Sequence, residues 1–461
     1  MIDRFKKPGL GNIRGRSWRN YQGELHLGRP DRGARIAKAL VVLGLLPALL
    51  VAAIYLLVRA PGEDSAVKQV PPAPSARPLQ ALHSQTDIRQ VLDPKVLFNP
   101  PSASLKITVD SHTLTVDTSL DIALKEYLLS KMDRKNSRYI GIVAMEIDTG
   151  RVLVMTGFNK IEPDVNPCIQ SDYPAASIFK IVTASAAVEA AGLSPDSSLM
   201  YNGQKHTLYK SQLKKRNNRY TNHTTLRDSF AQSINPVFGK IGSIRLGRDE
   251  LEKYAEALGF NREIPFDLPL DPSHLHISDE PYRLAEVASG FNRETTLSPL
   301  HGAVIVATLM RGGQWVTPTV IDRIADENGA TIYSRPAINA NRALTPETSK
   351  ALREMMTATI TSGTGRRSFR GYRRDKVLSR LTIGGKTGSI FNKAHDARFD
   401  WFVGYAQDEN LTKSIAVSVV VAHEEYIGTR AARYARMVMR EYFADYFARN
   451  EKPSRAEDKG V

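Results

Sequence analysis

Residues 175–192 read AASIFKIVTASAAVEAAG and combine a helical apolar pattern with a serine and a lysine near its start. The apolar run ends at Gly192, and glycine commonly terminates helices. Lys180 follows Ser177 by three residues, and residues three apart share one face of a helix. A partly buried lysine loses its proton through desolvation and can then act as a base toward a neighbouring hydroxyl. The stretch predicts a buried helix that begins with a nucleophilic serine.

The Ser-x-x-Lys pattern alone has little specificity, because it also occurs at Ser65–Lys68 and Ser211–Lys214. Ser65 lies in a proline-rich stretch, and Ser211 lies in the polar, basic stretch KSQLKKRNNR. Neither begins an apolar helix, so Ser177 is the favoured nucleophile. The basic run at 214–219 is interpreted as a solvated loop in preference to a patch that faces an anionic glycan.

Two other short motifs follow in the chain, and each occurs once: Ser233-Ile234-Asn235 and Lys386-Thr387-Gly388. The first lies between a predicted helix at 225–232 and Pro236, a residue suited to the first turn of the next helix. The second follows the apolar residues LTIGG and is expected to end a strand. Taken singly, each motif is typical of an ordinary turn.

Strand patterns occur early and late in the chain, with mostly helical patterns between them. The predicted strands are 105–109, 112–116, 140–147, 152–156, 381–385, 399–406 and 414–422, and helices are predicted at 119–132 and 434–447. Strands at both ends of a helical region imply one sheet assembled from distant segments, with helices packed on it. The fold class expected is therefore α/β of the α+β type.

The positive charge is concentrated near the N-terminus. The 461 residues carry a net charge of +15, and residues 1–38 hold ten Lys or Arg against three Asp or Glu, a local charge of +7. Residues 39–58 have no charged side chain and would be about 30 Å long as a helix, which matches a bilayer core. The run is longer than a signal-peptide core and lacks a small-residue cleavage site, so an uncleaved anchor is favoured over a signal peptide.

The anchor predicts the topology and the remaining domain boundaries. Residues 1–38 are expected to be a cytoplasmic basic tail, because positive flanks stay inside, and the chain after residue 58 is expected outside. Residues 59–104 are interpreted as a proline-rich linker or short pedestal. The catalytic domain is placed at 105–447, followed by a disordered tail at 448–461. An exported domain would not meet nucleic acid, which excludes the partner that the net charge first suggests.

Cysteine and histidine usage suggests no metal or redox chemistry. The single Cys168 excludes an intrachain disulfide framework and a cysteine-built zinc site, and it is expected to be a small buried residue. His274 and His276 stand in a loop rich in proline and aspartate and are expected to be solvated. No cofactor and no metal are therefore predicted.

In this order and spacing, the three motifs form the set of the penicillin-recognising serine enzymes. SPLHGAVIVATLMRGG (298–313), GTG (363–365) and DWFVGYA (400–406) also resemble segments of the transpeptidase domains of penicillin-binding proteins. The resemblance covers most of residues 105–445. It implies a central antiparallel five-stranded sheet packed between helices, with an all-helical subdomain. One departure concerns the residues before Ser177, where the family often has Pro-Gly and this chain has Ala175-Ala176.

The resemblance implies roles for the first two motifs. Ser177 would attack the carbonyl between the two terminal D-alanines of a peptidoglycan stem peptide, and Lys180 would take its proton. Ser233 would pass a proton to the departing D-alanine, and Asn235 would hold Lys180 and the substrate amide. β-Lactams would acylate the same serine.

Substrate binding is implied for the third motif. Lys386 and Thr387 would bind the terminal carboxylate through a charge-assisted hydrogen bond. Gly388 would leave the strand edge open, so that an extended peptide could pair with it. The backbone N–H groups of Ser177 and Ser389 would form the oxyanion hole.

The resemblance is to monofunctional, class B-like members, because residues 59–104 leave no room for a glycosyltransferase domain. A separate glycosyltransferase and other membrane proteins of cell-wall synthesis are then expected as partners, at the cytoplasmic membrane of a bacterium. The loop FDLPLDPS (266–273) lacks the deacylating glutamate of a class A β-lactamase. A D,D-carboxypeptidase and a non-catalytic β-lactam sensor or scaffold remain as alternatives. The acceptor and the role in division, elongation or sporulation stay open.

Overall fold

The computed structural model describes residues 84–109, 111–335 and 341–450, all of which belong to one compact unit that starts at Ala76. The predicted basic tail at 1–38 and the predicted anchor at 39–58 lie outside the described residues, as does the tail from residue 451 onward. Within the described ranges, no helix is both long enough and apolar enough to cross a bilayer. The membrane anchor therefore stays a prediction.

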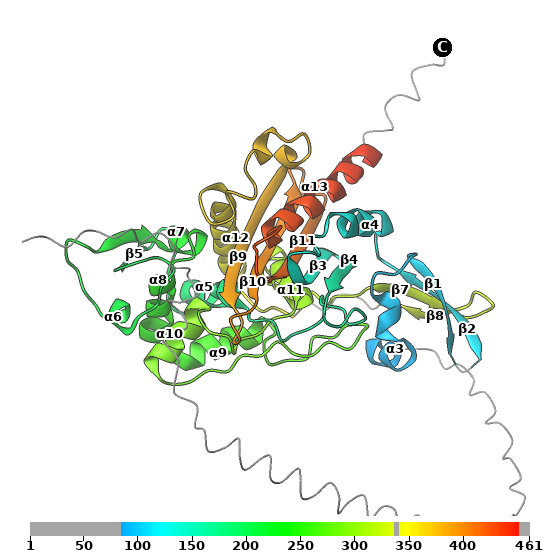
Figure 1. The fold of residues 1–461 in the computed structure, drawn as a ribbon, viewed down its shortest axis with the longest axis horizontal. Coiled ribbons are helices and arrows are strands. Elements are labelled where there is room, and N and C mark those ends of the chain that lie inside the picture. The colour runs from blue at the N-terminus through cyan, green and yellow to red at the C-terminus, as the bar shows by residue number, and fades with distance from the viewer. Residues whose placement is uncertain (1–83, 110, 336–340, 451–461) are drawn as a thin grey trace, which may run out of the picture. The chain divides into compact units, whose positions relative to one another are not determined.

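An antiparallel sheet of five strands forms the centre of the fold, in the order β4-β3-β11-β10-β9 (Figure 1). Its strands are β3 (Ser137–Glu146), β4 (Val152–Asn159), β9 (Leu381–Phe391), β10 (Arg398–Asp408) and β11 (Ser414–His423). β3 pairs with β11, so Val143 lies opposite Ser418 and the early hairpin joins the late strands. The expected sheet built from distant segments is present, and β9 is at one edge.

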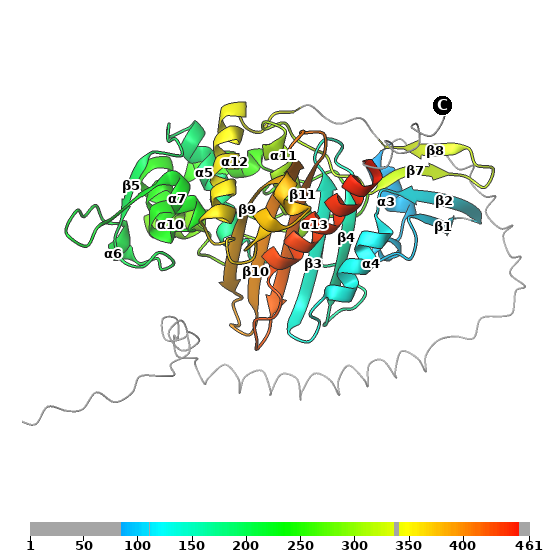
Figure 2. The same ribbon diagram turned by 90° about the horizontal axis from the view of Figure 1, so that it is seen from above.

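Helices cover both faces of this sheet because its strands are apolar on both sides. Along β11, Ala416 and Val420 belong to one buried cluster, whereas Val417 and Val419 belong to the other. The first face packs against α11 (Pro299–Met310). The second face packs against α13 (Ala431–Asn450) and α4 (Ile122–Lys131), as Figure 2 shows.

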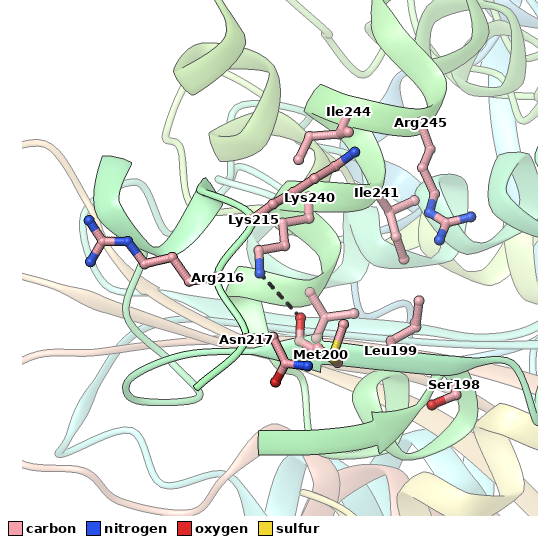
Figure 3. A pocket seen from close by; sticks show the side chains of 11 residues that line it. Ser198, Leu199, Met200, Lys215, Arg216, Asn217, Lys240, Ile241, Ile244 and Arg245 are labelled. Atoms are coloured by element: carbon pink, nitrogen blue, oxygen red, sulfur yellow. Dashed lines mark hydrogen bonds between the residues drawn. The ribbon is translucent and has the colours of Figure 1, made fainter. Parts of the chain in front are cut away.

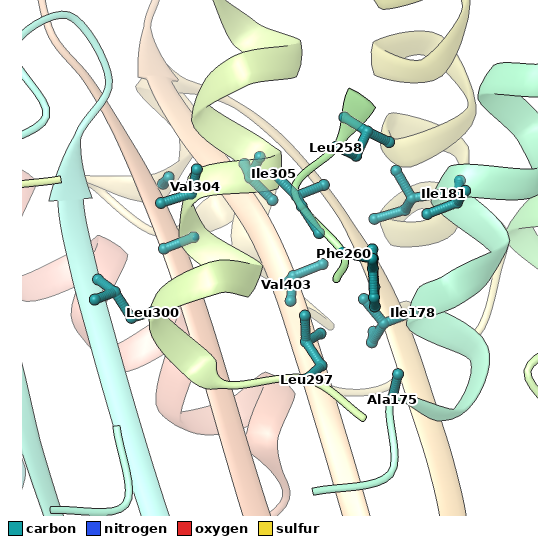
Figure 4. Close-up of a cluster of buried hydrophobic side chains, with 14 of the residues drawn as sticks. Ala175, Ile178, Ile181, Leu258, Phe260, Leu297, Leu300, Val304, Ile305 and Val403 are labelled. Atoms are coloured by element: carbon teal, nitrogen blue, oxygen red, sulfur yellow. The ribbon is translucent and has the colours of Figure 1, made fainter. Parts of the chain in front are cut away.

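α11 approaches the sheet closely, because a small residue faces it. A Cβ added at Gly302 would lie 2.6 Å from the Ser418 Oγ. Figure 4 shows the apolar cluster around this helix, in which Val304 and Ile305 of α11, Val403 of β10 and Ile178 gather beside Phe260. Ile178, next to Ser177 in the chain, is part of this cluster, so the cluster packs against the turn that carries Ser177.

A mainly helical subdomain is inserted between β4 and β9 (Figure 1). Its elements are η2 (Ala176–Phe179), α5 (Lys180–Glu189), α6 (Lys210–Leu213), α7 (Leu226–Ala231), α8 (Asn235–Lys240), the π-helix η3 (Ile241–Leu246), α9 (Gly247–Ala257), α10 (Pro281–Ser289) and α12 (Pro346–Thr361). The expectation of an all-helical subdomain is wrong in one detail, because β5 (Ser198–Tyr201) pairs with β6 (Asn222–Thr225). These strands have only four residues each, too few for a clear alternating pattern.

A second sheet of four strands lies beside the first, in the order β1-β2-β7-β8. The predicted strands β1 (Ser104–Val109) and β2 (His112–Thr118) are present. They are joined by β7 (Ile321–Ala325) and β8 (Thr331–Ser334), which the sequence pattern did not predict.

The C-terminal part of the predicted linker or pedestal at 59–104, which the sequence left unassigned, is folded where the structure describes it. α3 (Gln85–Val91) begins at Ser84, whose side chain forms a capping box with Asp87, and the 3₁₀ turn η1 (Pro94–Leu97) follows. Ile88 and Leu97 are fully buried. Ile88 and Leu92 are one helical turn apart, but a helix of seven residues is too short to give a clear helical period in the sequence.

The buried Asp267 connects α3 to the second sheet. Its carboxylate accepts hydrogen bonds from Gln85 Nε2 at 2.9 Å, Thr319 Oγ1 at 2.8 Å and the backbone N–H groups of Val320 and Ile321 at 2.5 and 3.0 Å. Burial raises the pKa of Asp267, and these hydrogen bonds oppose that rise. The carboxylate thus accepts from four donors. Gln85 and Thr319 also reach backbone carbonyls, so the N–H groups of Val320 and Ile321 depend on it most.

Replacement of Asp267 by alanine is expected to lower the free energy of unfolding by about 2–6 kcal/mol, because the buried N–H groups of Val320 and Ile321 lose this acceptor and each buried donor without a partner is destabilising by about 1–3 kcal/mol. Urea unfolding, followed by circular dichroism, measures the difference. Asp445→Ala is the matched control: it removes an exposed i,i+4 ion pair with Arg449 and should change stability by less than about 0.5 kcal/mol. Equal losses in the two variants would contradict the role given to Asp267.

Candidate active site

Ser177 and Lys180 lie side by side at the entrance to α5. Ser177 is in the 3₁₀ turn η2, and α5 starts at Lys180, so the predicted single helix begins as two joined elements. The Lys180 Nζ is 2.8 Å from the Ser177 Oγ. Lys180 is completely buried, whereas Ser177 is partly exposed. A substrate can therefore reach the hydroxyl but not the amine.

The other neighbours of Lys180 determine where its lone pair points. Its Nζ is 2.7 Å from the Asn235 Oδ1 and 2.5 Å from the Ser289 backbone oxygen, and both of these can only accept hydrogen bonds. The Asn235 amide is held in this orientation, because its Nδ2 donates to the His206 carbonyl at 3.0 Å. A neutral amine has two N–H groups, and these two acceptors take both. The lone pair then faces the hydroxyl of Ser177.

The surroundings favour the uncharged form of this amine. Burial, and secondarily the charge of Lys386, hold the pKa of Lys180 well below its usual range. Burial also lowers the pKa of Lys386 to about 7. In the part of the chain that the structure describes, neither lysine has a carboxylate within 4.0 Å. Desolvation without a counter-charge is the cause of both shifts.

Ser233 and Lys386 form a second contact in the site. Ser233 is in the turn between α7 and α8, and the Lys386 Nζ is 3.1 Å from its Oγ and 2.8 Å from the Thr387 carbonyl. Ser233 has a φ of 55°, in the left-handed region that non-glycine residues rarely adopt. Such strain concentrates at functional sites.

The motif Lys386-Thr387-Gly388 lies within β9, so the expectation that it ends the strand is wrong. Ser389 continues the ladder opposite Asp400, and Gly388 lies opposite Trp401. Threonine followed by glycine has the composition of a strand end, although the pairing continues to Phe391. The motif is therefore held on a rigid edge strand.

Gly388 brings this edge strand against the turn of Ser177. A Cβ at Gly388 would be 3.3 Å from the Ser177 backbone nitrogen and 3.3 Å from the Ala176 Cβ. Ser389 is exposed, and its Oγ accepts a hydrogen bond from Arg398 Nε at 2.7 Å. The two N–H groups predicted for the oxyanion hole thus belong to adjacent elements.

Ala176, which stands where the family often has glycine before the active serine, keeps a backbone conformation typical of glycine. Ala176 has a φ of 49°, the left-handed conformation that glycine adopts without strain. A Cβ on Gly290, at the end of α10, would collide with the Ala176 carbonyl oxygen. The turn keeps the glycine-like geometry with an alanine, at an energetic penalty of about 1–2 kcal/mol.

Several groups at the site were not assigned from the sequence. Ser289 and His206 contribute only backbone carbonyls, which leave no side-chain signal. Thr364, from the GTG segment, places its Oγ1 2.5 Å from the Thr387 Oγ1. Arg398 is the first residue of β10 and is partly buried, and a single arginine at a strand start has no distinguishing pattern. Gly290, directly after α10, is a sequence feature that could have indicated where this helix ends.

Cys168, His274 and His276, for which the sequence predicted no functional role, are not among the residues that form these contacts. Cys168 is buried, and burial raises its pKa to about 12. His274 and His276 are exposed. Among the described residues, no group of three His, Cys, Asp or Glu side chains is placed to hold a metal.

Residues 140–440 match the family described as the penicillin binding protein transpeptidase domain. The chain therefore belongs to this family. Stage V sporulation protein D of Bacillus subtilis (strain 168) is 26% identical over 369 residues, which cover 75% of this chain and 54% of that protein. Peptidoglycan D,D-transpeptidase PbpA of Mycobacterium tuberculosis (strain ATCC 25618 / H37Rv) is 24% identical over 314 residues, 61% of each chain. This chain thus spans about half to three fifths of the length of these relatives.

Solved structures share the fold. The crystal structure of PBPA from Mycobacterium tuberculosis has a TM-score of 0.58 at 22% identity, and it covers 71% of this chain and 82% of that one. The D,D-transpeptidase domain of a peptidoglycan glycosyltransferase from Eggerthella lenta has a TM-score of 0.58 at 23% identity, with 72% and 83% coverage. Penicillin-binding protein A of M. tuberculosis as its penicillin G acyl-enzyme complex has a TM-score of 0.55 at 22% identity, with 70% and 79% coverage.

The lowered pKa of Lys386 predicts a pH-dependent stability. Between pH 7 and 10.5 the folded protein holds Lys386 neutral, whereas the unfolded chain protonates it, so unfolding takes up a proton. The free energy of unfolding should therefore rise with pH, by up to about 1.4 kcal/mol per pH unit from this residue. Lys386→Met lacks this contribution, so the wild type should gain stability relative to the variant from pH 7 to pH 9. Parallel urea-unfolding profiles of the two proteins over this interval would contradict the assignment.

Proposed function

We propose that this protein is a peptidoglycan D,D-transpeptidase that works through a serine acyl-enzyme and is acylated by β-lactams. The observation that carries the proposal is the position of the Lys180 Nζ, 2.8 Å from the Ser177 Oγ and within hydrogen-bond distance of the Asn235 Oδ1 and the Ser289 carbonyl. When this amine is neutral and donates to both acceptors, its lone pair is left to take the proton of the serine. That arrangement suits a general base next to a nucleophile.

The contacts of Lys180 with Ser177 and of Lys386 with Ser233 suggest how acylation proceeds. The Ser177 Oγ attacks the carbonyl carbon of the penultimate D-alanine as its proton passes to the Lys180 Nζ. The carbonyl oxygen becomes an oxyanion, which the N–H groups of Ser177 and Ser389 stabilise. When the peptide bond breaks, the departing D-alanine nitrogen takes a proton from the Ser233 hydroxyl. Ser233 recovers one through its neighbour Lys386, 3.1 Å away, or from Lys180.

Lys386 and Thr387 bind the terminal carboxylate of the donor peptide. Lys386 is poised near neutrality, since burial lowers its pKa to about 7. An arriving carboxylate raises that pKa again, because a nearby negative charge favours the protonated amine. The substrate therefore generates the cation that binds it. β9 is the last strand of the sheet, so the extended peptide can add to its edge.

The acyl-enzyme then meets an acceptor amine. Attack by the amine of a second stem peptide gives a cross-link, whereas attack by water gives the D,D-carboxypeptidase reaction. The relative PbpA, itself named a peptidoglycan D,D-transpeptidase, supports the first outcome. Residues 39–58 would anchor the domain outside the cytoplasmic membrane, with residues 1–38 inside, and a separate glycosyltransferase would supply the glycan strands.

Covalent labelling by a fluorescent penicillin tests the nucleophile. Wild-type protein should form one adduct, and Ser177→Ala should form none. Ser211→Ala is the matched control, because Ser211 begins another Ser-x-x-Lys pattern and is exposed on a short helix. It should label as the wild type does. An adduct that persists in Ser177→Ala would sink the proposed mechanism.

Product analysis separates the two fates of the acyl-enzyme. The protein is incubated with a stem pentapeptide donor, with and without a diamino-acid acceptor peptide, and the products are resolved by mass spectrometry. We expect a cross-linked dimer that depends on the acceptor and on Ser177. Release of tetrapeptide alone, at an unchanged rate when the acceptor is present, would show a carboxypeptidase instead.

A further inference from the structure

A pocket of about 380 Å³ lies on the helical subdomain, between β5, the loop after α6 and the α8–η3 segment (Figure 3). Its volume falls in the range of small-ligand sites, about 300–1,000 Å³. Asn235 of the active site begins α8, whereas Lys240 of this pocket ends the same helix. The pocket is thus separate from the residues around Ser177.

Four cations line this pocket, and none is neutralised by a neighbour. Lys215 and Arg216 come from the loop, and Lys240 and Arg245 come from the helical side. No acidic residue is in the lining, and within the described ranges none of the four has a carboxylate within 4.0 Å. Several other cations on this subdomain do have acidic neighbours: Arg227, Arg248 and Arg283 each contact two carboxylates.

Lys240 is the least solvated of these four cations. Its Nζ contacts the Met200 backbone oxygen at 3.3 Å, as Figure 3 shows, and burial lowers its pKa. A partly desolvated lysine with only a distant carbonyl partner can gain further hydrogen bonds from an anion. An anionic ligand would replace the water that it has lost.

The floor and the rim of the pocket are apolar. Leu199, Val237 and Ile241 are buried beneath it, and Met200 and Ile244 are 42% and 47% exposed at its rim. Large side chains with such exposure mark binding surfaces when they surround a hollow. Ile244 belongs to η3, and a π-helical turn is an uncommon element that often occurs at functional sites.

We propose that this pocket binds an acidic peptide, with carboxylates on the four cations and an apolar side chain between Met200 and Ile244. Figure 3 shows the cationic groups on two walls and directed differently, so they do not converge on one point. Separate carboxylates along a peptide fit this spacing, whereas a single phosphate needs converging donors. The apolar floor also exceeds what a bare phosphate can use. The basic run at 214–219 therefore contributes to a binding site and is more than a solvated loop.

This site is independent of the proposed catalytic function, and the experiment keeps the two apart. The protein is first acylated with penicillin G, which closes the Ser177 site. Binding of a coumarin-labelled tetrapeptide, Glu-Leu-Glu-Ala, is then followed by fluorescence anisotropy. If Ser177 takes no penicillin, the catalytic proposal fails, and the same titration is made on the free protein. If the peptide does not bind, this proposal alone fails.

Two altered peptides test both halves of the pocket. Gln-Leu-Gln-Ala amide lacks the carboxylates, and Glu-Gly-Glu-Gly lacks the apolar side chains. Each should bind at least about tenfold more weakly than Glu-Leu-Glu-Ala. Equal affinity for either peptide would overturn the proposal. Displacement of the labelled peptide by an equal concentration of inorganic phosphate, or by phosphatidylglycerol vesicles, would assign the cations to phosphate groups and overturn it as well.

Variants locate the binding. Lys215→Glu with Arg245→Glu should weaken binding at least about tenfold, and Ile244→Ser, an exposed single change, should weaken it about threefold. The control variant, Lys135→Glu with Lys350→Glu, makes the same change in net charge at two exposed sites outside the pocket. It should bind as the wild type does. Equal weakening in the control would show attraction by overall charge, and undiminished binding in the pocket variants would place the peptide elsewhere. Thermal unfolding of each variant checks that it folds.

Discussion

The burial of one uncharged lysine is the constraint on which the site depends. Lys180 can stay neutral inside the protein only if its two N–H groups find acceptors and no carboxylate stabilises its charge. Three separate elements meet this requirement: α8 supplies Asn235, the end of α10 supplies the Ser289 carbonyl, and η2 supplies Ser177. These elements must therefore converge before the amine has any chemical use. The positions of α8 and α10 are explained by this need as well as by packing.

Lys386, the second buried lysine of the site, has a different environment. Lys386 is also buried, but it lies on β9, the last strand of the sheet. Its pKa is lowered to about 7, so its charge responds to what binds there. The pKa of the lysine beside the serine is thus held well below its usual range, and the pKa of the other is lowered to about 7. Two residues of the same type acquire distinct properties from their partners alone.

The sequence predicted the side chains of the site better than its backbone. Ser177, Lys180, Ser233, Asn235 and Lys386 were chosen from motifs, and the structure brings all five together. The backbone carbonyls of His206 and Ser289 could not be predicted, because any residue can supply them. The central sheet and the strand pair β1–β2 were expected from apolar patterns. β7, β8 and α3 were missed because their buried residues are few, and their packing comes from the buried Asp267 and its partners rather than from a local period.

The strand order of the central sheet also constrains how the chain folds during synthesis. β3 and β4 are made early, yet the partner of β3 is β11, and residues 160–380 precede even the first of the late strands. At roughly 5–20 residues per second, a ribosome needs on the order of ten seconds or more for that stretch. During this time β3 lacks its partner β11, although α4 precedes the hairpin in the chain and α11 is made within the same stretch. The central sheet can therefore be completed only after nearly the whole domain has been made, because β3 must wait for β11.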